Sequence, residues 1–389
     1  MKIALLTDGI HPYVIGGMQK HSYYLAKYLA RNGVQVDLYH FQQIPDSDIQ
    51  SLSVFSEEEK KFINAVVIDF PSQDIFPGHY IRASYRYSER IFDHFKNGSD
   101  VDFIYAKGFS AWKLMEEKAK GKAFPPVGVK FHGMNMFHKA YSLRSRMEQM
   151  LLRPAAQYNL SHADHVFSYG GRVTDIIRDN AHVPQEKIVE VPTGVQGSWI
   201  NPEGLKNNEI LRFVYVGRYE RLKGVEELMN AIMALLEKYS FEFHFIGPIP
   251  DHLRERSSRM IYHGVISSQE DLQEILRNSD ILVCPSYSEG MPNAVLEAMA
   301  SGMAVIASDV GAVNLLVSEK TGWLIRPGNT EDIQMAMIDA ITSSQQEKNA
   351  GTISLSEKKE NARALVKEKF VWDSIAKVLI KKITDIVSK

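Results

Sequence analysis

The stretch ILVCPSYSEGMPNAVLE, residues 281–297, decides the fold of this 389-residue chain. Its first four residues are apolar and read as a short buried strand, and after a loop the pattern becomes helical. Pro292 suits the first turn of that helix, because its missing N–H would have no partner within the helix anyway. A strand followed at once by a helix is the repeating unit of parallel α/β sheets.

The same alternation of apolar runs and amphipathic stretches extends from this segment toward both ends of the chain. Helices are expected at residues 19–32 and 372–387, and the segment 342–360 reads as an exposed helix and loop. The pattern predicts the α/β class with two doubly wound, Rossmann-like domains. The expected strands are 3–7, 35–40, 65–70, 103–106, 127–131, 165–168, 188–191, 211–216, 243–246, 260–262, 281–284 and 304–307.

A run rich in turn-forming residues, VPTGVQGS at 191–198, marks the domain boundary. We expect an N-terminal domain at 1–195 and a C-terminal domain at 196–371, since 389 residues exceed the usual size of a single core. Ligands of doubly wound sheets bind beyond the carboxyl ends of the strands. The two domains are therefore expected to share an interdomain cleft.

The bulk composition is that of an ordinary folded enzyme: 44% apolar, 24% charged and a net charge of -2, which does not indicate nucleic-acid binding. Cys284 is the sole cysteine, so an internal disulfide is excluded and a reducing compartment fits. The start MKIALL reads as a strand and not as a signal peptide. The longest candidate membrane stretch, 294–307, is interrupted by Glu297 and is too short. A cytoplasmic location is expected.

The start of the helix at Pro292 predicts an anion site. The backbone N–H groups of Asn293, Ala294 and Val295, together with the positive end of the helix dipole, are expected to be free to bind a diphosphate. Glu289 stands just outside this site and Glu297 lies further along the helix, where each carboxylate is able to accept hydroxyl hydrogen bonds. The alternative is that Glu289 is a surface glutamate and Glu297 an ordinary helical one.

A second segment, VYVGRYERLKG at 214–224, places two cations around a turn that follows a strand. The fork of Arg218 suits phosphate, and Lys223 adds a point charge. Solvated surface cations are the alternative for both, and Arg221 is expected to be one. A third segment, PYVIGGMQKH at 12–21, carries Gly16 and Gly17 before a helix, which permits close approach of a ligand.

Together these segments resemble the retaining GT-B glycosyltransferases of family 4, glycosyl transferases group 1, with their Glu-x7-Glu motif. The motif is Glu289 to Glu297 here, and the resemblance extends to GWLIRPG at 322–328. Three departures stand out. The chain has GPIP at 247–250 where many relatives have Gly-x-Gly, Lys107 replaces a frequent histidine, and Asn314 stands where glutamate is common.

The resemblance implies a role for each matching residue. Glu289 would meet hydroxyls of the donor hexose and Glu297 the ribose, while Arg218 and Lys223 would neutralise the leaving diphosphate. His132, in KFHG, would face the donor sugar from the N-terminal domain, and the last helix, 372–389, would pack back on that domain. The other donor-binding residues carried over are Gly16, Gly17, Val265, Gly290, Met291, Asn293, Ala294 and Val295.

The expected activity is transfer of a hexose from a UDP-, GDP- or ADP-sugar to a glycan or lipid-linked acceptor, with retention and without a covalent nucleophile. No metal or other cofactor is expected, because the two cations at 218 and 223 would replace a divalent ion. The resemblance points to surface polysaccharide or glycolipid biosynthesis. A sugar-nucleotide epimerase and a non-catalytic nucleotide-sugar-binding protein are the alternatives.

Two stretches of the N-terminal domain, 80–87 and 141–153, mix arginines with apolar or aromatic residues. Such stretches are able to lie in the headgroup layer of an anionic membrane, which would make the protein peripheral on the inner face of the cell membrane. The alternative is that their apolar residues pack on the core and their arginines are merely solvated.

Overall fold

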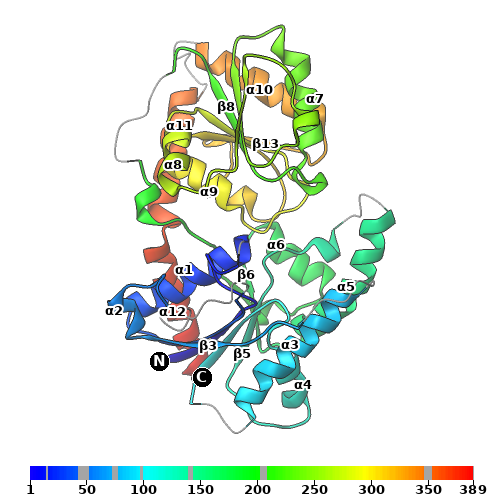
Figure 1. Cartoon of the computed structure of the whole chain (residues 1–389), viewed down its shortest axis with the longest axis vertical. Helices are drawn as coiled ribbons and strands as arrows, with labels where there is room; N and C mark the ends of the chain where they lie inside the picture. Colours follow the sequence, from blue (N-terminus) through cyan, green and yellow to red (C-terminus); the bar gives the residue numbers. More distant parts are fainter. Residues whose placement is uncertain are drawn as a thin grey trace. The chain divides into compact units, whose positions relative to one another are not determined.

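The protein is described by a computed structural model over residues 1–14, 16–42, 52–71, 78–96, 100–138, 143–201, 208–345 and 353–388. The chain divides into two compact units, one made of residues 1–193 with 372–389 and the other of 194–371. Each unit is a parallel sheet with helices packed on it (Figure 1). The prediction of two parallel α/β domains is confirmed.

The first unit has a seven-stranded sheet in the order β3-β2-β1-β4-β5-β6-β7, and all neighbours are parallel. The order reverses between β1 and β4, and this reversal is the topological switch point at which such sheets bind ligands. The strands are β1 (Lys2–Leu6), β2 (Gln35–His40), β3 (Ile63–Val67), β4 (Phe103–Lys107), β5 (Val127–Lys130), β6 (His165–Ser168) and β7 (Ile188–Glu190).

Helices of the first unit form two groups: α1 contacts α2 and α12, while α4 contacts α3 and α5. The last helix is held by Trp372, whose ring stacks on Tyr28 at 5.9 Å and meets His21 edge-on at 5.1 Å. Residues 372–389 are thereby part of the first unit. These helices are α1 (Gly17–Arg31), α2 (Glu57–Lys60), α3 (His79–Phe95), α4 (Trp112–Ala119), α5 (Leu143–His162), α6 (Arg172–Asp175) and α12 (Trp372–Val387).

The second unit has a six-stranded parallel sheet in the order β10-β9-β8-β11-β12-β13, with its switch point between β8 and β11. Its strands are β8 (Arg212–Val216), β9 (Glu242–Ile246), β10 (Met260–Gly264), β11 (Ile281–Cys284), β12 (Ala304–Ser308) and β13 (Gly322–Ile325). Its helices are α7 (Val225–Leu236), α8 (Gln269–Arg277), α9 (Asn293–Ala300), α10 (Thr330–Gln345) and α11 (Leu355–Lys369). Helix α7 contacts α10, and α9 contacts α11.

Three expectations about secondary structure were wrong. Strand β3 begins two residues before the expected start at 65, and β13 was absent from the predicted strands. The segment 342–360 is not simply exposed, because α11 buries Lys358 and Lys359. Burial of Lys359 is compensated by Asp280, whose Oδ1 lies 2.8 Å from its Nζ. Residues 346–352 of this segment lie outside the described residues. Among the helices that the structure describes, none is long and apolar enough to cross a bilayer.

Candidate active site

The loops after β8 and β11 are packed on each other at the switch point of the second sheet. Tyr287 N donates to Leu222 O at 2.8 Å and so joins the two loops. Gly224 has a φ of +67°, and a Cβ added there would collide with Pro285 O. Glycine is required at this position both by the left-handed backbone and by the close approach. This contact fixes how the two loops meet.

Lys223 and Glu289 are brought together by this contact. Lys223 Nζ donates to Glu289 Oε1 at 2.7 Å, and both side chains are partly buried. Burial disfavours the charged form of Lys223, but the negative charge and the hydrogen bond of Glu289 outweigh it and raise its pKa. Lys223 is therefore a cation at neutral pH, and the carboxylate of Glu289 is held in one orientation.

Arg218 is placed differently. Its side chain is 71% exposed, and it forms an ion pair with Glu220 at 3.0 Å. Its backbone is fixed, because its carbonyl oxygen accepts a 2.8 Å hydrogen bond from the hydroxyl of Tyr215. The guanidinium thus stands in solvent beside the switch point, where an anionic ligand is able to reach it.

The expectation that Arg221 is a solvated surface cation was wrong. It is not merely a solvated cation, since its guanidinium donates to both carboxylate oxygens of Glu227 at 2.9 and 2.7 Å. It also donates to the hydroxyl of Tyr287 at 2.8 Å and lies 4.6 Å from the centre of that ring. Arg221 therefore ties the loop after β8 to α7 and to the loop after β11.

The N-terminus of α9 follows Pro292, as the sequence indicates. The N–H of Val295 lies 3.2 Å from Pro292 O, so the expectation that it is free to bind an anion was wrong. Asn293 and Ala294 are half-exposed, and amides of a first helical turn lack acceptors within the helix. These two positions retain the capacity to bind an anion, whereas Met291 is buried in the core.

A further loop supports the turn at Glu289 and Gly290. Ala312 N donates to Gly290 O at 2.7 Å. Gly311, with a φ of +60°, lies so close that an added Cβ would collide with the carbonyl oxygens of both residues. Sequence reasoning missed Gly311, although its place after the expected strand 304–307 was a usable signal.

The two remaining residues of the second unit that were expected to bind the donor differ in exposure. Glu297 is buried within α9, and Val265 is exposed in the loop after β10. Glu297 is thus set deeper than Glu289, which lies in the loop that precedes the helix.

In the first unit the glycine pair and His132 lie together. His132 follows β5, and its Nδ1 lies 2.7 Å from the hydroxyl of Tyr169. A Cβ added to Gly17 would stand 3.1 Å from His132 Nε2, and one added to Gly16 would collide with the side chain of Gln19. Gly17 thus allows α1 to begin directly against the histidine.

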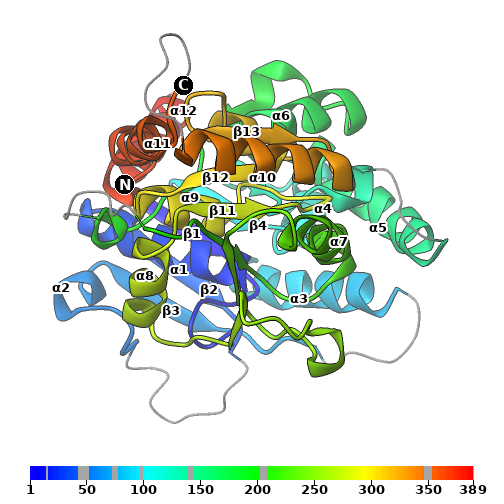
Figure 2. The ribbon, with the colours of Figure 1, turned by 90° about the horizontal axis from the view of Figure 1, so that it is seen from above.

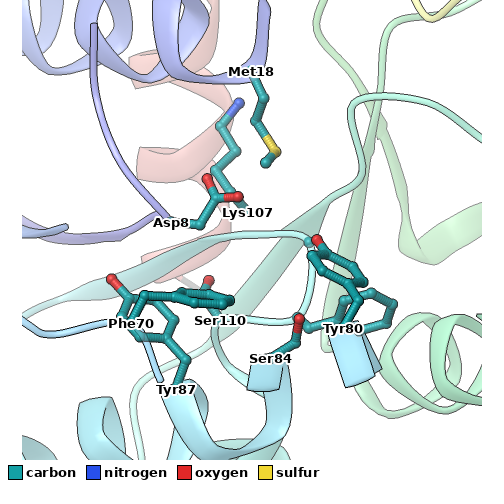
Figure 3. Close-up of a pocket in the computed structure, with 10 residues that line it drawn as sticks. Asp8, Met18, Phe70, Tyr80, Ser84, Tyr87, Lys107 and Ser110 are labelled. Atoms are coloured by element: carbon teal, nitrogen blue, oxygen red, sulfur yellow. The ribbon is translucent and has the colours of Figure 1, made fainter. Parts of the chain in front are cut away.

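A pocket opens at the switch point of the first sheet, between the loops after β1 and β4. Figure 3 shows Asp8 and Lys107 on one side of it, with Tyr80 and Ser84 of α3 opposite. The carboxylate of Asp8 accepts a 3.1 Å hydrogen bond from Gln19 Nε2. Desolvation is the main cause that raises the pKa of Asp8 to about 6.

Lys107 is the buried cation of this pocket. Its Nζ lies 2.8 Å from Nδ1 of the buried His21, and burial lowers the pKa of Lys107 to about 7. Sequence reasoning recognised Lys107 only as a departure from the family and did not single out Asp8. Both residues lie at the carboxyl ends of β1 and β4, the two strands that flank the switch point. Their position at these strand ends would have identified them as candidate site residues.

The comparisons with known proteins agree with this geometry. Residues 15–197 match the family model described as Glycosyltransferase Family 4, and residues 211–343 match the one described as Glycosyl transferases group 1. The MMP alpha-(1->4)-mannosyltransferase of Mycolicibacterium hassiacum is 27% identical over 213 residues, which are 52% of this chain and 49% of that relative. This chain therefore aligns with about half the length of that enzyme.

Solved structures share the whole fold. Sucrose-phosphate synthase from Thermosynechococcus elongatus has a TM-score of 0.79 at 19% identity, covering 100% of this chain and 99% of that one. Anabaena HepE in complex with UDP-glucose has a TM-score of 0.65 at 16% identity, covering 100% and 99%. With one family model matching within each half of the chain, the protein belongs to the GT-B glycosyltransferases of family 4 and group 1.

Proposed function

We propose that this glycosyltransferase moves a hexose-type sugar from a nucleotide diphosphate sugar to a glycan or lipid-linked acceptor, with retention of configuration. The observation that carries the proposal is the Lys223–Glu289 pair at the switch point of the second sheet. It combines a cation for a leaving phosphate with a carboxylate that accepts hydrogen bonds from sugar hydroxyls.

The donor diphosphate would lie between Lys223 and the N-terminus of α9. Helix amides at Asn293 and Ala294 and the helix dipole favour negative charge there. The exposed guanidinium of Arg218 would close on the diphosphate when the donor binds. HepE, the structural neighbour in complex with UDP-glucose, supports a donor of this chemical class. Glu297 would then accept from the ribose and Val265 would contact the base.

The reaction needs no covalent nucleophile. The bond from the anomeric carbon to the phosphate oxygen breaks first, and the acceptor oxygen then bonds to the same face of the sugar. The acceptor proton passes to the departing phosphate oxygen. Arg218 and Lys223 stabilise the charge that develops on the diphosphate, and we propose that they take the part of a divalent ion.

The acceptor would bind the first unit in the pocket between Asp8 and Tyr80. A carboxylate and the hydroxyl of Ser84 offer hydrogen bonds to a polyol, and the aromatic ring offers a face for a sugar. We place the enzyme in the cytoplasm, in peripheral contact with the inner face of the cell membrane. There it would act in surface polysaccharide or glycolipid biosynthesis.

The test uses purified full-length protein with UDP-glucose, GDP-mannose and ADP-glucose in turn. Slow transfer to water releases nucleoside diphosphate and free sugar, which are followed by chromatography and by proton NMR. Unaltered hexose that appears first as the α anomer is expected from one donor. Lys223→Ala should lower this release by about 10²–10³, and Arg256→Ala, at an exposed cation of the same unit, should leave it unchanged.

Other outcomes would contradict the proposal. A hexose of altered configuration would make the protein an epimerase. Tight binding of a nucleotide sugar without any turnover would make it a binding protein. A β anomer as the first product would replace retention with inversion.

A further inference from the structure

The first half of α5 exposes an apolar face. Leu143 is 82% exposed, Met147 62%, Met150 68% and Leu151 45%. Residues spaced by four, three and one along a helix lie on one side of it. These four residues are called the α5 face below. In a water-facing helix this side would carry polar residues, so the face indicates a contact that the described residues of the first unit do not supply.

The same half-helix is fixed by contacts that lie away from the α5 face. Ser145 is buried, Gln149 Nε2 donates to Asn135 O at 3.0 Å, and Arg153 Nε donates to Met136 O at 3.0 Å. Asn135 and Met136 belong to a short 3-10 helix after β5. The α5 face is therefore presented by an anchored helix.

The two halves of α5 differ on either side of Pro154. After the proline, Ala155, Ala156 and Leu160 are buried in the first unit. Before it, the apolar side chains point to solvent, and Figure 2 shows α5 at the margin of the first unit. The exposed apolar side chains of α5 are thus confined to the segment before Pro154, which is about three turns long.

Positive charge lies along one edge of the α5 face. Arg146 is exposed and Arg153 follows seven residues later, so helical geometry places both on the same flank, about a quarter turn from the apolar stripe. Glu148 lies on the other flank. The side chain of Arg144, the third arginine of this stretch, lies outside the described residues. An apolar stripe with arginines beside it is complementary to a negatively charged bilayer surface.

We propose that the α5 face inserts into the boundary between headgroups and acyl chains of an anionic phospholipid bilayer, with Arg146 at the level of the phosphates. The methionines are flexible and adapt to lipid packing, and arginine reaches the phosphates while its stem stays in the apolar layer. The surface deepens the proposed function, because it would bring the first unit to a lipid-linked acceptor.

The other stretch expected to face a membrane, 80–87, is not part of this surface. Ala83, Ser84 and Tyr87 are buried, and the hydroxyl of Tyr85 donates to Glu116 at 2.8 Å. Apart from Tyr80, the aromatic residues of this stretch are committed to contacts within the first unit. The proposal is therefore confined to α5.

Co-sedimentation of the full chain with extruded vesicles tests the proposal. The vesicles are phosphatidylcholine alone, or with about a third phosphatidylglycerol, at low and high salt. The triple variant Leu143→Ser, Met147→Ser, Met150→Ser should bind anionic vesicles at least roughly tenfold more weakly than wild type. Arg146→Ser should weaken binding about fivefold at low salt and much less at high salt.

The matched control is the double variant Met233→Ser, Met335→Ser, at two exposed methionines of the second unit. It should bind like wild type, and thermal melting checks that every variant is folded. No binding of wild type at low salt, wild-type binding by the triple variant, or an equal loss in the control would overturn the proposal. A wild-type dimer that the triple variant dissociates, without vesicle binding, would assign the α5 face to a second copy.

Vesicle binding is measured without turnover, so its outcome is separate from that of the proposed activity. The triple variant should release nucleoside diphosphate from the donor at the wild-type rate. Absence of donor turnover in wild type would remove the proposed function and leave a positive vesicle result standing.

Discussion

Lys223 Nζ and Glu289 Oε1 lie 2.7 Å apart although 66 residues separate them in the chain. The contact exists because β8 and β11 are neighbours at the switch point and Gly224 lets their loops touch. The carboxylate of Glu289 raises the pKa of Lys223 and so keeps it a cation, which suits a site where a diphosphate and a sugar arrive together.

Replacing Lys223 by alanine is expected to lower kcat by about 10²–10³, because it removes a cation that faces the leaving diphosphate. The change also leaves Glu289 without its partner, so the effect of Glu289→Gln should not add fully to that of Lys223→Ala. Steady-state release of nucleoside diphosphate by both single variants and the double variant measures this. Wild-type turnover in folded Lys223→Ala would remove the residue from the site.

Arg218→Ala is expected to cost a similar factor of about 10²–10³, for the same electrostatic reason. Because Arg218 is largely exposed, the variant should melt at the temperature of the wild type. Turnover and thermal melting are measured side by side. An unchanged rate would show that the guanidinium stays with Glu220 and in solvent throughout the reaction.

Chelation by EDTA is expected to leave most of the activity intact, since Arg218 and Lys223 are proposed to replace a divalent ion. The control is the same assay after addition of Mg²⁺ or Mn²⁺ to chelated enzyme. Complete loss with EDTA and recovery with either ion would contradict the metal-free mechanism.

His132→Ala is expected to lower kcat more than it weakens nucleotide binding, because His132 belongs to the first unit and the nucleotide is proposed to bind the second. Tyr169→Phe removes only the 2.7 Å partner of His132 Nδ1 and should have a smaller effect in the same direction. Single-turnover rates and titration with UDP separate the two effects. An unchanged kcat in folded His132→Ala would leave the histidine a structural role.

Much of the fold follows from local pattern. Strands β2, β6 and β11 have the predicted bounds, because apolar runs between turn residues define them without reference to the rest of the chain. Strand β13 was missed, since GWLI continues directly into the polar RPG turn and only its pairing with β12 makes it a strand.

The candidate site was harder to predict, since its contacts depend on sheet order. Lys223 and Glu289 were each identified, but their hydrogen bond follows from the adjacency of β8 and β11. Asp8 and Lys107 line the same pocket because β1 and β4 are neighbours in the sheet. This adjacency was not part of the prediction from the sequence. Arg221 was wrongly predicted to be a solvated cation. Its contacts with Glu227 and with the ring of Tyr287 arise from tertiary packing, which the local sequence does not show.

Asp8→Asn is expected to stabilise the protein above pH 6 and to have little effect near pH 4. The pKa of Asp8 is raised from 3.8 to about 6 in the folded state, mainly by desolvation, so the folded chain holds the proton more tightly than the unfolded chain. Its contribution to stability is full below 3.8 and is lost as the pH rises through 6. An asparagine does not ionise and escapes this loss, which amounts to about 2 kcal/mol after allowance for the partial exposure of the side chain.

Thermal melting of wild type and Asp8→Asn across this pH range measures the difference in stability. The control is Asp69→Asn, at an exposed carboxyl of the same unit. A difference in melting temperature that does not change with pH would show that Asp8 is already ionised in the folded protein at pH 4, and its part in a desolvated acceptor pocket would then fall.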